Sequence, residues 1–140
     1  MRVKVIYVEI TNQCNLNCRT CYNRSGLNKE RKEVSKAQLI TMIEKFLPYG
    51  LHRVILSGGE PTLHTSFHDV LGLVDQYPGL SFGVVTNGTN PDGKLIEMLN
   101  TRKNLTLQVS LDGSSEEQNE KTRGKGNFEK AISFAKQIHN

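Results

Sequence analysis

The chain of 140 residues has no apolar run that approaches the roughly 20 residues of a membrane-spanning helix. It also lacks the apolar segment and cleavage site of a secretory signal peptide, because it begins with the alternating Met1-Arg2-Val3-Lys4. Neither sign of charge dominates, since 18 basic residues stand against 14 acidic ones, and no Lys/Arg stripe is interleaved with aromatic residues. These absences predict a cytoplasmic protein with no membrane partner and no specific nucleic acid partner.

Cysteine is scarce as well. The three cysteines, Cys14, Cys18 and Cys21, are odd in number and crowded together, whereas a disulfide framework needs an even and dispersed set. In a reducing compartment, clustered cysteines are more often metal ligands or redox groups. The sequence also has no nucleophile–His–acid arrangement, no Walker-type loop and no Rossmann glycine fingerprint, and we assign no role to its four histidines.

Two hydrophobic periods alternate along the chain. Strand-like segments cover residues 3–10, 53–57, 80–86 and 105–111. Helix-like apolar spacings follow them at residues 39–47, 67–74, 95–99 and 128–138. Strands separated by helices predict an α/β fold, with a parallel sheet of four βα units and right-handed crossovers.

Local signals mark the ends of several of these elements. Ser35 and Gln38 have the spacing of a capping box. Asn90 is expected to cap the third helix, with Pro91 at its first position. Asn127 is expected to open the fourth helix. The charged stretch 24–33 is expected to be a mobile loop.

Unusual residues follow each predicted strand. A cysteine-rich loop follows the first, Gly58-Gly59-Glu60-Pro61 the second, Thr86-Asn87-Gly88 the third, and Ser110-Leu111-Asp112-Gly113 ends the fourth. Function gathers beyond the carboxyl ends of parallel strands. Four such motifs at one edge of a sheet predict a single active site.

Four βα units do not close an eight-stranded barrel, and the fourth strand would keep an unpaired edge. We therefore expect residues 1–140 to be one domain at the N-terminal end of a longer chain. A dimer that covers the edges is the alternative.

The cysteine loop has the spacing C-x3-C-x2-C. Thiolates suit iron–sulfur clusters and zinc, and three cysteines would leave one iron of a [4Fe–4S] cluster open to another ligand. The charge of Arg19 should favour the ionised thiolates. A zinc site would need a fourth ligand, but the nearest downstream histidine, His52, lies thirty-one residues after Cys21. Iron–sulfur, zinc and buried structural cysteines all stay open at this point.

The other motifs have a physical rationale too. Gly58 and Gly59 allow close backbone approach to a ligand, and Pro61 restricts Glu60 to an extended conformation. A polar side chain aimed inward at a strand end, such as Ser110 or Asp112, must find a partner. The planar guanidinium of Arg123 suits a carboxylate. Ordinary turns and a solvated basic loop are the plain alternatives for these segments.

The cysteine spacing after a first strand, followed by Gly58-Gly59-Glu60-Pro61 after a second, resembles the radical S-adenosylmethionine (SAM) superfamily. The resemblance extends through Thr86-Asn87-Gly88 and Ser110-Leu111-Asp112-Gly113 to Arg123-Gly124. It is strongest to the branch of peptide and protein maturases, which carry an additional cluster-binding domain. It implies a partial (β/α)6, TIM-like barrel, of which this sequence supplies four units.

The resemblance also implies an activity and a site. Cys14, Cys18 and Cys21 would hold a [4Fe–4S] cluster that cleaves SAM reductively, and the resulting 5′-deoxyadenosyl radical would abstract hydrogen from a substrate. Residues 58–61 would meet the amino group of SAM. Ser110 and Arg123 would hold its carboxylate with Asp112 nearby, and Thr86 and Asn87 would face the ribose or the substrate.

The implied partners are a low-potential electron donor of the flavodoxin or ferredoxin type and a peptide, protein or small-molecule substrate.

Family members carry an aromatic residue before the third cysteine, near the adenine, whereas this sequence has Thr20 there and Tyr22 on the other side of Cys21. Four alternatives remain: a small-molecule enzyme of cofactor biosynthesis, a zinc-binding interaction module, a SAM binder without cleavage, and a fragment that is inactive alone.

Overall fold

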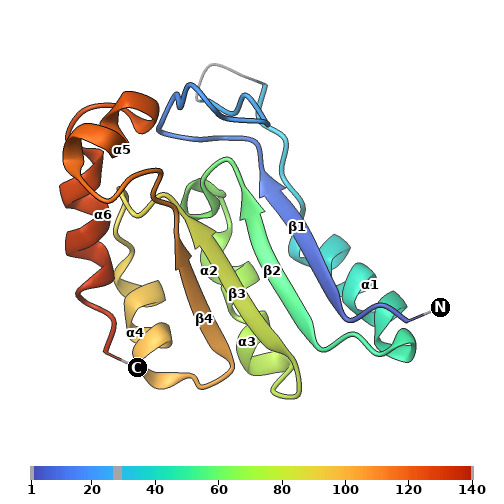
Figure 1. The fold of residues 1–140 in the computed structure, drawn as a ribbon. Helices are drawn as coiled ribbons and strands as arrows, with labels where there is room; N and C mark the ends of the chain where they lie inside the picture. Colours follow the sequence, from blue (N-terminus) through green and yellow to red (C-terminus); the bar gives the residue numbers. More distant parts are fainter. Residues whose placement is uncertain (1, 27–29, 140) are drawn as a thin grey trace.

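The computed structural model describes residues 2–26 and 30–139 (Figure 1). Four parallel strands form one sheet, and their order in the sheet is their order in the chain. They are β1 (Val5–Thr11), β2 (Arg53–Gly58), β3 (Ser81–Thr86) and β4 (Leu105–Val109). The predicted α/β fold with a parallel sheet is confirmed.

Helices connect the strands and cover one face of the sheet (Figure 1). They are α1 (Lys36–Phe46), α2 (Phe67–Leu71), α3 (Leu73–Gln76), α4 (Gly93–Thr101), α5 (Glu116–Arg123) and α6 (Asn127–Ala135), with short 3-10 helices η1 (Leu47–Tyr49) and η2 (Pro61–Leu63). Helix α5 does not cover this face, because it lies beyond the carboxyl ends of the strands. Within the described part of the chain, no helix is long and apolar enough to cross a membrane.

The hydrophobic core lies between the sheet and the helices. From the sheet, Ile10, Val54 and Phe82 contribute fully buried side chains, and Leu39 of α1 and Leu95 of α4 cover them. Removing such apolar surface from water is the main favourable term in folding. The core therefore fixes the sheet, and with it the relative positions of the four strand ends.

The opposite face of the sheet is left uncovered by helices. Tyr7 on this face is 74% exposed, as the predicted alternation of the first strand requires. Arg53 spans this face and donates from Nη2 to Thr106 Oγ1 at 3.0 Å. It passes over Gly83, where a Cβ atom would lie only 2.8 Å from Ile55 Cδ1. The uncovered face therefore carries both polar side chains, such as Arg53 and Thr106, and apolar ones, such as Tyr7 and Ile55.

Two of the three end signals are confirmed. Ser35 caps α1 in a capping box, because its hydroxyl accepts from Gln38 N–H while Gln38 Oε1 accepts from Ser35 N–H. Helix α6 begins at Asn127. The expected cap of the third helix is wrong: Asp92 caps α4 by accepting from Leu95 N–H at 2.8 Å. Asn90 instead donates from Nδ2 to Thr62 Oγ1.

The single helix expected around residues 67–74 is interrupted. Helix α2 ends at Leu71 and α3 begins at Leu73, with Gly72 between them. Glycine inside a helix costs about 1 kcal/mol relative to alanine, which favours a break at this position.

Helix α5 is absent from the sequence-based expectation. It carries no apolar side chain, and its buried residue is Asn119, so hydrophobic periodicity cannot detect it. Other signals were present: Ser115 accepts from Gln118 N–H, acidic residues occupy the first turn, and basic residues occupy the last. Capping and charge identify this helix where periodicity fails.

The mobility expected for residues 24–33 stays a prediction, and residues 27–29 lie outside the described residues. Residues 30–33 lie against the end of β1. Asn12 N–H donates to Lys32 O at 3.2 Å, and Val34 N–H donates to Ile10 O at 2.9 Å. Thr11 and Glu33 form an antiparallel bridge. Backbone hydrogen bonds thus hold residues 30–34, which we call the strap, against the end of β1.

Candidate active site

A cleft of about 200 Å³ lies at the carboxyl ends of the strands. Its lining contains most of the predicted site residues, namely Cys14, Cys18, Cys21, Gly58, Gly59, Thr86, Asn87, Ser110 and Arg123. The other predicted residues, Glu60, Pro61 and Asp112, are not part of this lining. The topology thus brings the four motifs to one place, as the strand ends of a parallel sheet require.

Sequence reasoning missed part of this lining. Ser57 and Val85, the second-last residues of β2 and β3, also line the cleft. Their neighbours Leu56 and Val84 are buried in the helix-side core. Because side chains alternate along a strand, this alternation was the signal that could have placed Ser57 and Val85 on the site side.

The cysteine loop is held at both ends. Cys14 is buried near the end of β1, and Cys18 and Cys21 are half-buried, all three with free thiols. Leu16 N–H donates to Cys14 Sγ at 3.4 Å. Arg19 N–H donates to Thr122 O of α5 at 2.9 Å, which ties the far side of the loop to the helix that the sequence did not predict.

Burial dominates the electrostatics of these thiols. Desolvation raises the pKa of Cys14 and of Cys18 above the usual value. The cation that opposes this rise in pKa at Cys18 is Arg123. Arg19, which the sequence predicts to favour the ionised thiolates, is exposed, and its effect on them stays a prediction.

Gly58 and Gly59 pack directly against the base of the cysteine loop. A Cβ atom on Gly58 would lie 2.3 Å from Thr11 O, and one on Gly59 would lie 2.2 Å from Gln13 O. Gly59 N–H donates to Thr11 O at 2.8 Å. The sequence predicts that these glycines let a ligand approach closely. In the structure, the backbone of residues 11–13 makes this close approach, and it holds the base of the cysteine loop against the end of β2.

Glu60 lies beneath the cleft and is fully buried. Its Oε1 accepts from Thr86 Oγ1 at 2.7 Å and from Thr62 Oγ1 at 2.8 Å, and its Oε2 accepts from Asn87 N–H at 2.8 Å. Desolvation raises the pKa of Glu60, and these hydrogen bonds oppose the rise. Glu60 has the predicted extended conformation before Pro61, and its carboxylate joins the end of β2 to the end of β3.

Asp112 and Arg123 form an ion pair at the rim of the cleft. Arg123 Nη2 lies 2.8 Å from Asp112 Oδ1, and Thr122 Oγ1 donates to Asp112 Oδ2 at 2.8 Å. Although partial burial would raise the pKa of Asp112, the hydrogen bonds from Arg123 and Thr122 hold it below its usual value. Arg123 Nε is buried and has no hydrogen-bond partner. A buried donor without a partner is the kind of group that a bound ligand can satisfy.

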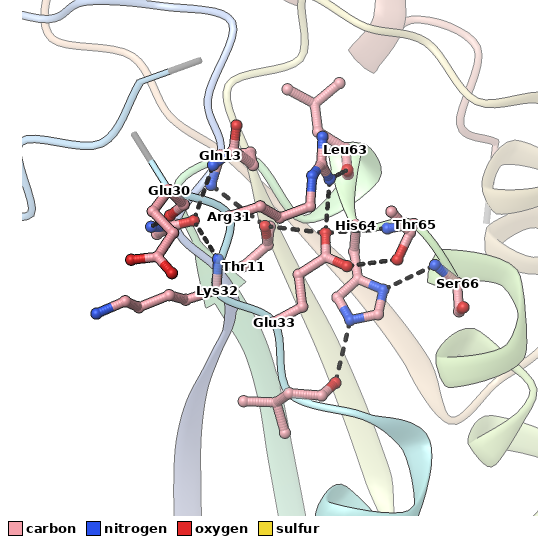
Figure 2. Close-up of polar contacts among 12 residues, drawn as sticks. Thr11, Gln13, Glu30, Arg31, Lys32, Glu33, Leu63, His64, Thr65 and Ser66 are labelled. Atoms are coloured by element: carbon pink, nitrogen blue, oxygen red, sulfur yellow. Dashed lines mark hydrogen bonds and ion pairs between the residues drawn. The ribbon is translucent and has the colours of Figure 1, made fainter. Parts of the chain in front are cut away.

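The strap carries a polar cluster that sequence reasoning also missed. Figure 2 shows the Glu33 carboxylate turned toward Thr11, Arg31 and Thr65. Burial would raise the pKa of Glu33, but the hydrogen bonds from Thr65 and Arg31 lower it to about 2. We call Thr11, Arg31, Glu33 and Thr65 the clasp, because it joins the base of the cysteine loop to the segment after Glu60.

His64 adds a second fastening beside the clasp (Figure 2). Ser66 N–H donates to His64 Nδ1 at 3.0 Å, so the ring hydrogen lies on Nε2, which donates to Val34 O at 3.0 Å. The strap thus connects the first two strand ends through side chains that lie about thirty residues apart in the chain.

The donor set suits an iron–sulfur cluster. Three thiols line one cleft, and the cysteines of a cubane cluster each bind a different iron. Among residues 2–26 and 30–139, no three His, Cys, Asp or Glu side chains converge on a point that could hold one metal ion. Arg123, whose buried Nε has no hydrogen-bond partner, lines the same cleft, and a guanidinium suits the carboxylate of an amino acid ligand.

Similarity to known proteins identifies a family for this chain. Residues 8–140 match the Radical SAM superfamily model. The sporulation killing factor maturation protein SkfB of Bacillus subtilis is 29% identical over 131 residues, which cover 94% of this chain and 32% of SkfB. The mycofactocin maturase MftC of Mycolicibacterium smegmatis is 30% identical over 133 residues, which cover 94% of this chain and 33% of MftC.

A solved structure shows the same fold. Streptococcus suis SuiB bound to SAM superposes with a TM-score of 0.83 at 19% identity, over 99% of this chain and 31% of SuiB. SuiB has also been solved bound to its precursor peptide SuiA. This chain therefore spans about a third of the length of the relatives that it matches.

Members of the matched superfamily use a [4Fe–4S] cluster and SAM, which favours iron–sulfur over zinc at the three cysteines. The family model covers all four strand ends and the whole cleft. The chain belongs to the radical SAM superfamily.

Proposed function

We propose that this chain is the SAM-binding core of an enzyme that cleaves SAM reductively and directs the radical to a peptide or protein. The observation that carries the proposal is one cleft lined by three thiols, the Gly58–Gly59 backbone and Arg123, in a chain that matches the superfamily over residues 8–140. Residues 1–140 would form one core domain of a longer protein, which is consistent with their span of about a third of the relatives.

In this proposal, Cys14, Cys18 and Cys21 would hold a [4Fe–4S] cluster and would leave one iron without a cysteine ligand, to which SAM could bind. A [4Fe–4S] cluster bound there would supply the single electron that reductive cleavage of SAM requires. A flavodoxin-type or ferredoxin-type donor would supply that electron, and a reducing cytoplasm would keep the thiols available.

The chain's own residues would bind and orient SAM. Arg123 is held in place by Asp112, and its free Nε would donate to the methionine carboxylate beside Ser110. The backbone of Gly58 and Gly59 would face the amino group. Glu60 would act as a positioning residue, because its carboxylate is buried under this backbone and bonded to Thr86 and Asn87.

A peptide or protein substrate is supported by the relatives. SkfB and MftC are named as maturation proteins, and SuiB binds a precursor peptide. The uncovered face of the sheet, on which Tyr7 and Glu9 are exposed, continues from the cleft and would face such a substrate.

The test is anaerobic reconstitution with iron and sulfide, followed by electron paramagnetic resonance (EPR) of the reduced protein with and without SAM. We expect a reduced [4Fe–4S] signal that shifts when SAM is added. Cys18→Ala should bind no cluster and cleave no SAM. Asn17→Ala, at an exposed position of the same loop, should retain both properties. A Cys18→Ala variant that keeps the cluster and cleaves SAM would contradict the assignment of the three thiolates.

A second variant tests the SAM side of the cleft. Glu60→Ala should retain the cluster but weaken SAM binding, because the backbone of Gly58 and Gly59 would lose its anchor on β3. Equilibrium binding to the reconstituted protein measures this effect. Unchanged affinity in Glu60→Ala would remove Glu60 from the site.

A further inference from the structure

We infer that Asn87 sets the reduction potential of the cluster through an N–H···S hydrogen bond to Cys14. The inference rests on the proposed function only in that Cys14 holds one of the irons. It gives Asn87 a role toward the cluster in place of the contact with ribose or substrate that the sequence predicts.

The contact joins two distant parts of the chain. Asn87 directly follows β3 and is 7% exposed, and Cys14 belongs to the loop after β1. Asn87 Nδ2 lies 3.9 Å from Cys14 Sγ and 2.9 Å from Asn15 Oδ1. A side-chain amide has two hydrogens, so each of these acceptors can receive one. Neither hydrogen is then left for a ribose or a substrate.

The orientation of the amide is fixed by its other end. Asn87 Oδ1 accepts from Thr89 N–H at 2.8 Å and from Thr89 Oγ1 at 2.7 Å. Reversing the amide would place the NH2 group against the Thr89 N–H donor, so Nδ2 must be the atom on the sulfur side. The backbone is held as well, because Asn87 N–H donates to the buried Glu60 carboxylate.

Cys14 is therefore a distinctive member of the cysteine set. It is the buried one of the three, and it receives N–H donors from Leu16 within its own loop and from Asn87 across the cleft. Low local polarity strengthens such hydrogen bonds. Of the three cysteine sulfurs, the one that a change at Asn87 affects directly is therefore Cys14 Sγ.

Hydrogen bonds to the sulfurs of a cluster are among the features that set its potential. Reduction adds one electron from the external reductant to the cluster and moves no proton, so the negative charge on the cluster and its thiolates increases. An N–H donor stabilises the more negative state more strongly. Asn87 should therefore raise the potential and make the cluster easier to reduce.

A purely structural role for Asn87 gives a different expectation. If the side chain only fastened the cysteine loop to β3, its loss would lower stability or iron content but leave the potential of the loaded clusters unchanged. The midpoint potential separates the two roles, because it does not depend on the fraction of chains that carry a cluster.

The experiment is a redox titration of the reconstituted chain, with the reduced cluster followed by EPR. Asn87→Asp keeps the shape but removes the donor, and we expect a tenfold smaller equilibrium constant for reduction, which is about 59 mV for a one-electron couple. Asn87→Ala, which adds no charge, should shift the potential in the same direction by a smaller amount.

Asn90→Asp is the matched control, because Asn90 lies in the same loop and donates to Thr62 Oγ1 rather than to sulfur. Its potential should equal that of the wild type. An unshifted potential in Asn87→Ala, or equal shifts in Asn87→Asp and Asn90→Asp, would overturn the inference. A wild-type chain that takes up no cluster would overturn the proposed function as well, so the two failures are distinguishable.

Discussion

At the ends of β2 and β3, the Glu60 carboxylate is fully buried and accepts hydrogen bonds from Thr62, Thr86 and Asn87. At the end of β4, the side chains of Asp112 and Arg123 are 26% and 19% exposed, and Arg123 Nε is unpartnered. We call these regions the Glu60 side and the Asp112 side of the cleft. On the Glu60 side, the carboxylate is already hydrogen-bonded within the chain. On the Asp112 side, the Arg123 Nε donor has no partner.

This difference has a physical reason. A buried carboxylate is tolerated only when hydrogen bonds replace its lost hydration, so the Glu60 side must be complete before any ligand binds. A partly exposed ion pair retains some hydration and can exchange water for a ligand. Preorganisation is therefore concentrated at the ends of β2 and β3, around the Glu60 carboxylate.

The largest effect on folding should come from Gly59→Ala on the Glu60 side. The new Cβ atom would lie 2.2 Å from Gln13 O, and backbone at this junction cannot move without shifting the cysteine loop. We expect the free energy of unfolding to fall by about 3 kcal/mol in urea denaturation. Gly93→Ala is the matched control, because nothing lies within 4 Å of its Cβ position, and it should cost nothing.

An intermediate effect should come from the clasp that supports the Glu60 side. The pKa of Glu33 is lowered to about 2 in the folded chain and is about 4.3 in an unfolded one, so its contribution to stability is present above pH 4.3 and is lost as pH falls toward 2. Between about pH 6 and pH 3, we expect the wild type to lose roughly 2 kcal/mol more stability than Glu33→Gln does.

Urea denaturation at both pH values measures this difference. Glu30→Gln, on the same strap but exposed, controls for the general titration of carboxylates and should follow the wild type. Parallel pH profiles for wild type and Glu33→Gln would show that the clasp contributes no pH-dependent stability.

The smallest effect on folding should come from Asp112→Asn on the other side of the cleft. A partly exposed ion pair contributes about 1 kcal/mol or less, so the urea midpoint should barely change. SAM affinity should fall severalfold, because the Arg123 guanidinium would lose its charged anchor. Glu117→Gln, which breaks the exposed pair with Lys121 on α5, is the control and should change neither quantity. A large loss of stability in Asp112→Asn would erase the contrast between the two sides.

Sequence patterns anticipated the strands and most helices because a core-facing surface leaves a hydrophobic period in the chain, as Leu39 and Ile43 do in α1. Helix α5 escaped this reasoning because it buries only Asn119 and has no apolar stripe. The sequence did not predict the clasp for another reason. Glu33 and Thr65 lie 32 residues apart, and no local sequence pattern indicates that they are in contact.

The sequence by itself determined which residues can carry chemistry. The cysteine spacing, the two glycines before Glu60 and the placement of polar motifs after each strand are local properties, and the order of strands in a parallel sheet brings them to one edge. Only the tertiary structure decided how each one is used. It buried the Glu60 carboxylate beneath the cleft, aimed Asn87 at Cys14 and left Arg123 Nε free, because these outcomes depend on which distant groups satisfy each donor and acceptor.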